Sequence, residues 1–225
     1  MVDLIYVDEQ PDERNKVVRR AVQSGEFSHE QVRAIAPKQS LVETIDVVVE
    51  FRPRVLITDF RLSEHSPYIE FSGTDLVRAF REKYAEFPCF VTTSFAGEAA
   101  DQDIDTNLVF PKGDFLDRRL QEQGGLPFFK RVKSKINRYE RSIADAEFEL
   151  EALVYRQRTE RLNSHEVERL IELDSFVEST IRNDQRLPKN LKHAALKPFN
   201  DVTRRLDAIL NELEVNLGIG GNEDE

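Results

Sequence analysis

The sequence lacks several features that whole classes of protein require. Its 225 residues include one cysteine, Cys89, so no disulfide can form within the chain. No apolar run is long enough to cross a bilayer, and the first ten residues have neither the basic segment nor the apolar core of a signal peptide. A net charge of -10 also lacks the basic excess that a general nucleic-acid or membrane-surface binder needs. We therefore expect a cytoplasmic protein that binds neither DNA nor membranes directly.

Strand and helix signals alternate over the first half of the chain. Amphipathic segments with helix-start residues, such as Pro11 and the Ser40–Glu43 pair, predict helices. Short apolar segments between them predict five strands, at 3–8, 31–37, 54–59, 89–94 and 107–110. This alternation predicts an α/β fold with a doubly wound, five-stranded parallel sheet that carries helices on both faces.

The second half has helical signals only. No proline or glycine occurs between Pro127 and Leu162, so we expect one continuous helix over that segment. Apolar residues recur along it at spacings of three and four, forming a coiled-coil seam of Ile136, Tyr139, Ile143, Ala146, Leu150 and Leu153. The seam has two interpretations, because later helices of the same chain can cover it or a second copy can pair with it in a homodimer.

Further helices are expected from Ser164 to Val177 and from Phe199 to Leu213, which makes the second half an all-α helical bundle or coiled-coil module. The predicted organisation is a first domain over 1–138, a helical module over 139–217 and a disordered acidic tail over 218–225.

Polar side chains close the predicted strands. Because the carboxyl ends of parallel strands meet at one edge of a doubly wound sheet, these residues should converge there: Asp8, Glu9, Asp59, Thr93 and Lys112. Three carboxylates that lie together repel one another unless a divalent cation sits among them. A hydroxyl and an ammonium beside such a cation form a binding site for a phosphoryl group. Each residue alone could be a helix cap, a turn cap or half of an ion pair. These interpretations would require all five residues to fall at strand ends by chance.

This constellation resembles the receiver domain of bacterial response regulators, the CheY-like fold with flavodoxin-like strand order, over roughly residues 1–138. The resemblance implies that Asp59 in "LITDF" accepts a phosphoryl group. It also implies that Mg²⁺ is held by Asp8, Glu9, Asp59 and the backbone carbonyl of Arg61. By the same resemblance Thr93 is the switch hydroxyl and Lys112 contacts the phosphate.

The resemblance further implies partners and an output. The phosphoryl donor is a sensor histidine kinase or a phosphotransfer protein, and the chain carries no turnover enzyme domain. The leading hypothesis is a phosphorylation-controlled response regulator that acts on an output protein, or dimerises, through the helical module. Two alternatives remain open: a phosphorelay intermediate that passes the group between Asp59 and a histidine, either His165 or one on another protein, and a scaffold that is never phosphorylated.

Several positions depart from the family pattern or are ambiguous. Gly113 stands where proline usually follows the lysine, and Val109 stands at the position of the usual switch aromatic. The segment after Asp59 is longer than the common receiver loop. We interpret its His65 as a solvated histidine. Its three bulky side chains either pack the loop down or contact a partner: Tyr68, Ile69 and Phe71.

Two assignments have close competitors. Thr92 and Ser94 flank Thr93, so the switch hydroxyl is open to a shift of one residue. A serine cap at Ser164 also accounts for the residues around His165.

Overall fold

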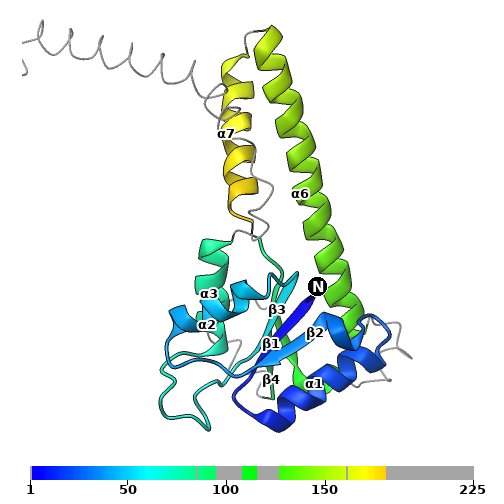
Figure 1. Cartoon of the computed structure of the whole chain (residues 1–225), viewed down its shortest axis with the longest axis vertical. Coiled ribbons are helices and arrows are strands. Elements are labelled where there is room, and N and C mark those ends of the chain that lie inside the picture. Colours follow the sequence, from blue (N-terminus) through cyan, green and yellow to red (C-terminus); the bar gives the residue numbers. More distant parts are fainter. Residues whose placement is uncertain (1, 85, 95–107, 116–126, 161, 181–225) are drawn as a thin grey trace, which may run out of the picture. The chain divides into compact units, whose positions relative to one another are not determined.

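The computed structural model describes residues 2–84, 86–94, 108–115, 127–160 and 162–180 (Figure 1). These residues fall into two compact units, one of residues 2–145 with Ser179 and Thr180, and one of residues 146–178. Two predicted segments lie outside the described residues: the helix from Phe199 and the acidic tail.

The first unit is built on one sheet of five parallel strands in the order β2-β1-β3-β4-β5. This is the flavodoxin-like order, and the predicted doubly wound fold is confirmed. The strands match the predicted segments closely and comprise β1 Leu4–Val7, β2 Val32–Ile35, β3 Val55–Asp59, β4 Cys89–Thr93 and β5 Val109–Pro111. The strand order reverses between β1 and β3, so the carboxyl ends of these two strands flank the edge where ligands bind in such sheets.

The central strands are covered on both faces. Every residue of β1, β3 and β4 is buried, which explains why these segments are continuous apolar runs rather than alternating ones. Cys89 at the start of β4 is 1% exposed, and this burial raises the pKa of its thiol. Cys89 is therefore a small residue of the core.

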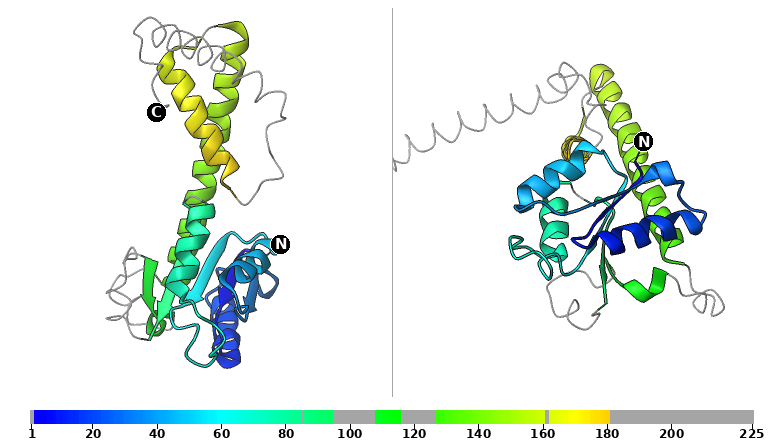
Figure 2. Two further views of the ribbon diagram at one scale, coloured as in Figure 1. Left: turned by 90° about the vertical axis from the view of Figure 1, so that its left-hand side faces the viewer. Right: turned by 60° about the horizontal axis from the view of Figure 1, so that its bottom comes forward.

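Helices pack on both faces of the sheet, as the views in Figures 1 and 2 show for α1 and α3. Helix α1 (Pro11–Gln23) shares one core with β1, β3 and the start of α6 (Phe128–Thr159). Helices α2 (Leu41–Glu50) and α3 (Gly73–Lys83) contact each other, and α3 packs on β3 and β4. Ser40 caps α2 by accepting a hydrogen bond from the backbone of Glu43, as its sequence spacing predicted.

Helix α6 is unbroken over its 32 residues, so the prediction of one continuous helix is confirmed, with its end at Thr159. Its seam is buried within the single chain, since the six seam residues are each at most 8% exposed. In the second unit Ala146, Leu150 and Leu153 of α6 form a core with side chains that include Leu170 and Leu173 of α7 (Ser164–Glu178). The structure therefore favours the interpretation in which the seam is covered within one chain.

One detail of the helical segments differs from the sequence expectation. The cap of α7 is Asn163 rather than Ser164, because Asn163 and Glu166 exchange side-chain to backbone hydrogen bonds of 2.9 and 3.0 Å. Helix α6 also leaves Phe148 and Tyr155 exposed, at 76% and 69%. Among the described helices, none is both long and apolar enough to cross a membrane.

A charged network joins α6 to the amino ends of the strands. Nε of Arg54 donates to Oε1 of Glu140 at 2.6 Å, and a second nitrogen of the guanidinium pairs with the other oxygen of the same carboxylate. Arg54 also donates to Oδ2 of Asp3 at 3.1 Å, and Asp3 is 3% exposed. Gln31 and Lys133 donate to the same Asp3 oxygen at 2.9 and 3.3 Å. Arg54 therefore pairs with two carboxylates, that of Asp3 directly before β1 and that of Glu140 in α6.

Replacing Arg54 with methionine should destabilise the first unit by about 2 kcal/mol. Glu140 would lose its bidentate hydrogen-bond partner, and the buried Asp3 would lose one of its donors. Thermal unfolding followed by circular dichroism measures the loss. The matched control is Arg78→Met, whose side chain is 51% exposed and pairs with Asp75 one turn earlier in the same helix. Equal melting temperatures for the two variants would contradict the role given to Arg54.

Candidate functional site

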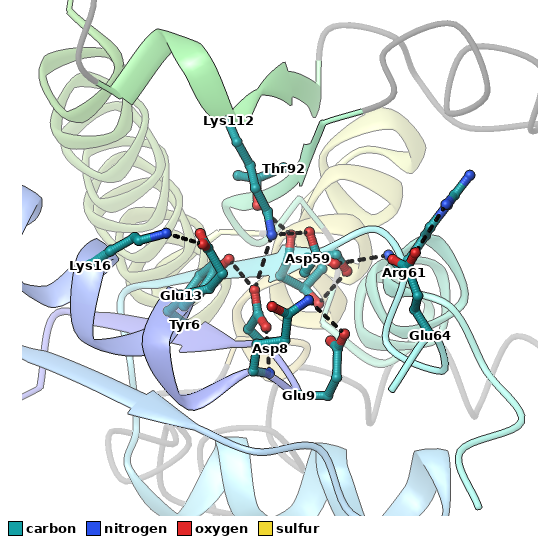
Figure 3. Close-up of polar contacts among 12 residues, drawn as sticks. Tyr6, Asp8, Glu9, Glu13, Lys16, Asp59, Arg61, Glu64, Thr92 and Lys112 are labelled. Atoms are coloured by element: carbon teal, nitrogen blue, oxygen red, sulfur yellow. Dashed lines mark hydrogen bonds and ion pairs between the residues drawn. The ribbon is translucent and has the colours of Figure 1, made fainter. Parts of the chain in front are cut away.

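Three carboxylates meet at the carboxyl ends of β1 and β3. Asp8 and Glu9 directly follow β1, and Asp59 is the last residue of β3. One oxygen from each lies within 4.8 Å of the others (Figure 3). Asp8 is fully buried, Asp59 is 6% exposed, and the side chain of Glu9 is 2% exposed. The structure thus brings together the three acidic residues that the sequence predicted would converge.

Lys112 bridges two of these carboxylates. It lies directly after β5 and begins a short 3₁₀ segment, Lys112–Phe115. Its Nζ is 2.8 Å from Oδ1 of Asp59 and 3.3 Å from Oδ2 of Asp8 (Figure 3). Burial disfavours the ammonium, but the hydrogen bond and charge of Asp59, together with Asp8, outweigh it and raise the pKa of Lys112. The lysine therefore stays cationic beside the carboxylates.

The electrostatics of Asp59 favour a bound cation. Burial raises the pKa of this carboxyl, Lys112 opposes the rise, and the charges of Asp8 and Glu9 add to it. One lysine does not compensate three clustered carboxylates, so a further positive charge should stabilise the ionised cluster.

A buried oxygen of Glu9 also fits a cation. Its Oε2 is buried and has no hydrogen-bond partner among the described residues. An unsatisfied buried carboxylate oxygen costs free energy that a bound ion would recover. Because all the donors are carboxylate oxygens, the cluster suits a hard divalent cation such as Mg²⁺.

Asp8 is held by contacts that the sequence did not reveal. The hydroxyl of Tyr6 donates to Oδ2 of Asp8 at 2.7 Å, and the backbone N–H of Gln10 donates to Oδ1 at 2.7 Å. Arg14 donates to the backbone carbonyl of Asp8 at 2.6 Å. Tyr6 lies within an apolar strand and has the pattern of a core residue, so no sequence signal distinguishes its hydroxyl. Burial, and then the charge of Asp8, raise the pKa of this phenol, which therefore remains a donor.

Gly73 allows α3 to begin close to the backbone of Asp59. This first residue of α3 donates its N–H to the carbonyl of Phe60 at 2.9 Å. A Cβ at this position would lie 1.9 Å from the carbonyl oxygen of Asp59. Glycine is thus required for α3 to begin against the end of β3.

The remaining predicted residues lie at the same edge, and their roles stay predictions. Thr93 ends β4, is 1% exposed and pairs across the ladder with Pro111. The neighbouring Thr92 donates its hydroxyl to the carbonyl of Thr58 at 3.1 Å, a bond within the sheet. The backbone N–H of Arg61 donates to Oδ2 of Asp59 at 3.1 Å, which places Arg61 beside the acceptor.

The segment after Asp59 behaves only partly as expected. Ile69 and Phe71 are buried, at 7% and 8%, and pack the loop down as predicted, whereas Tyr68 is 75% exposed. His65 is 59% exposed at its side chain, in keeping with a solvated histidine, but its Nδ1 lies 3.2 Å from Oε1 of Glu9. His165 is an exposed residue in the first turn of α7, and a phosphotransfer role for it stays a prediction.

Comparison with known proteins yields structural similarity only. The sequence matches no protein-family model and no curated protein. Among solved structures, the anti-anti-sigma factor PhyR from Bartonella quintana is 14% identical with a TM-score of 0.43, and the match covers 65% of this chain and 52% of that one. This chain therefore spans about half the length of PhyR. The two-component response regulator RcsB, in a complex with DNA, is 17% identical with a TM-score of 0.37, and the match covers 80% of this chain and 91% of that one.

Proposed function

We propose that this chain is a response regulator of a two-component or phosphorelay system, phosphorylated on Asp59. The observation that carries the proposal is the arrangement at the carboxyl ends of the strands, where Lys112 lies between Asp8 and Asp59 and Glu9 completes a cluster of three carboxylates. In a sheet of this order such an edge is the place of ligand binding. An acidic cluster next to a lysine can hold a cation and a phosphoryl group together.

The chemistry assigned to the chain's own residues is nucleophilic. An oxygen of the Asp59 carboxylate attacks the phosphorus of the donor and forms a mixed anhydride. The bond from phosphorus to the donor breaks, and its electron pair leaves with the donor group, a histidine imidazole or the carboxylate of an acyl phosphate. Lys112, 2.8 Å from Asp59, is placed to pair with the transferred phosphoryl oxygens. A Mg²⁺ ion on Asp8, Glu9 and Asp59 would neutralise charge on those oxygens.

The proposed partners follow from this chemistry. A sensor histidine kinase or a phosphotransfer protein supplies the phosphoryl group, and the chain itself turns over no substrate. Output passes through protein contacts of the helical unit or through dimerisation. The two large apolar side chains that α6 leaves exposed, Phe148 and Tyr155, support contact with another protein.

Intact-mass spectrometry tests the proposed function. The full chain incubated with acetyl phosphate and Mg²⁺ should gain the mass of one phosphoryl group, and chelation of Mg²⁺ should prevent the gain. Borohydride reduction followed by peptide sequencing should place the modification at Asp59. The wild type could instead bind Mg²⁺ but gain no mass from acetyl phosphate or from any histidine kinase of its source organism. That result would show that the protein is a scaffold rather than a phosphorylated regulator.

A further inference from the structure

The loop between β3 and α3 is anchored close to the cation site. Its end regions are fixed in the core by Leu62, which is fully buried, and by Ile69 and Phe71. Backbone hydrogen bonds from Ser66 to the carbonyl of Ser63, and from Ile69 to the carbonyl of Ser66, shape its middle. This conformation holds His65 over Glu9, 56 residues away in the sequence.

The geometry determines which group donates in the contact between His65 and Glu9. Nδ1 of His65 lies 3.2 Å from Oε1 of Glu9 and 3.3 Å from Nε2 of Gln10. An ionised carboxylate can only accept, so Nδ1 must carry the proton and donate to Glu9. A protonated Nδ1 cannot accept from Gln10, and the Gln10 amide therefore donates to Oε1 of Glu9, at 3.4 Å. Two donors thus meet at one oxygen of Glu9.

The two oxygens of Glu9 have different surroundings. Oε1 is contacted by His65 from the loop and by Gln10 from the start of α1, whereas Oε2 is buried and has no partner among the described residues. The carboxylate belongs to the cluster with Asp8 and Asp59. The imidazole is not part of that cluster, and it contacts the Glu9 carboxylate from outside. A group that binds one oxygen of a ligating carboxylate orients the other toward the metal.

We propose that His65 is a positioning residue for the cation site, holding Oε1 of Glu9 so that Oε2 faces a divalent cation bound with Asp8 and Asp59. This inference rests on the cation site of the proposed function and adds a residue of the long loop to it. Since coupling between two events is reciprocal, cation binding should in turn stabilise the loop around His65.

Isothermal titration of the full chain with Mg²⁺ tests the proposal. His65→Ala should weaken Mg²⁺ binding about 10-fold or more, the usual effect of losing an outer hydrogen-bond partner of a metal ligand. His65→Gln keeps an N–H donor and should restore the affinity to within about 3-fold of the wild type. His29→Ala, an exposed histidine on a separate 3₁₀ segment, is the matched control and should leave the affinity unchanged.

A double-mutant cycle separates positioning from a general effect of the loop. In a Glu9→Gln background, His65→Ala should cause no further loss of Mg²⁺ affinity, because its effect passes through the Glu9 carboxylate. Hydrogen exchange gives a second readout, since Mg²⁺ should slow exchange at residues 62–70 in the wild type and not in His65→Ala.

Three results would overturn the inference: a wild type that does not bind Mg²⁺, equal affinities of wild type and His65→Ala, or additive losses in the cycle. The phosphorylation assay is separate, so the two proposals can fail independently. A chain whose Mg²⁺ affinity depends on His65 but which takes up no phosphoryl group retains this inference and loses the proposed function. A chain that is phosphorylated on Asp59 but whose Mg²⁺ affinity does not depend on His65 retains the proposed function and loses this inference.

Discussion

An Asp59→Asn variant is expected to remain folded, to be more stable than the wild type without a cation, and to take up no phosphoryl group. The amide is not a nucleophile toward phosphorus, so labelling by acetyl phosphate should fall to the background. Its oxygen can still accept the 3.1 Å hydrogen bond from the backbone of Arg61, and Lys112 keeps its contact with Asp8. The local backbone should therefore survive the change.

The gain in stability follows from the sign of the pKa shift. Burial raises the pKa of Asp59, so folding favours its neutral form over its charged form. Above the raised pKa the ionised group therefore reduces the free energy of unfolding, whereas asparagine is neutral at every pH. We expect a gain of about 1 kcal/mol, or roughly 2–4 °C in melting temperature, for a protein of this size.

The controls for this variant separate chemistry from surface charge. Asp46→Asn removes the same charge from an exposed position of α2 and should leave both labelling and melting temperature unchanged. Millimolar Mg²⁺ should raise the melting temperature of the wild type more than that of Asp59→Asn, because binding to the folded state stabilises it by mass action. Equal phosphoryl uptake by wild type and Asp59→Asn would refute the assignment of the acceptor.

Gly73→Ala is expected to cause a large loss of stability. The new Cβ would lie 1.9 Å from the Asp59 carbonyl oxygen and 2.9 Å from its carbonyl carbon, and neither atom can move without shifting β3. Overpacking against flexible side chains costs about 1–3 kcal/mol, and a clash with backbone should cost at least the upper end of that range. For a chain of this length we expect a fall of roughly 6–12 °C in melting temperature.

The same change should impair the site even where the chain folds. Any relief of the clash moves the backbone of Asp59 or the start of α3, so Mg²⁺ affinity should fall together with stability. Gly113→Ala is the matched control, because a Cβ at Gly113 meets no atom within 4 Å. If the melting temperatures of the two alanine variants agree within about 2 °C, the fold does not require glycine at position 73, and this prediction is wrong.

The sequence predicted those parts of the molecule that depend on local pattern. The apolar runs of β1 and β3 are buried on both faces, and each ends next to a carboxylate, so both their pairing and the convergence of Asp8 with Asp59 follow from the topology. Helix α6 is likewise local, since nothing between Phe128 and Thr159 interrupts its hydrogen bonds.

Contacts between distant segments could not be read in the same way. The bond from His65 to Glu9 depends on the path of a loop with no periodic pattern, and periodicity carries no information on where such a loop turns. Tyr68 illustrates the same limit, because it is exposed although two neighbouring bulky side chains are buried. The Tyr6 hydroxyl was missed for another reason, since an aromatic residue in a buried strand has the same pattern whether or not its polar end reaches a functional group.

The buried sulfur of Cys89 gives this protein a built-in reporter. It is the only thiol of the chain, it is 1% exposed, and its raised pKa keeps it protonated, so alkylating reagents should reach it only when β4 separates from its neighbours. The rate of alkylation therefore follows opening of the sheet without any engineered probe. Conversely, a cysteine introduced at the exposed position of Tyr68 would be the only fast-reacting sulfur in the folded chain. A fluorophore or spin label attached there would record the movement of the long loop as cation and phosphoryl donor are added.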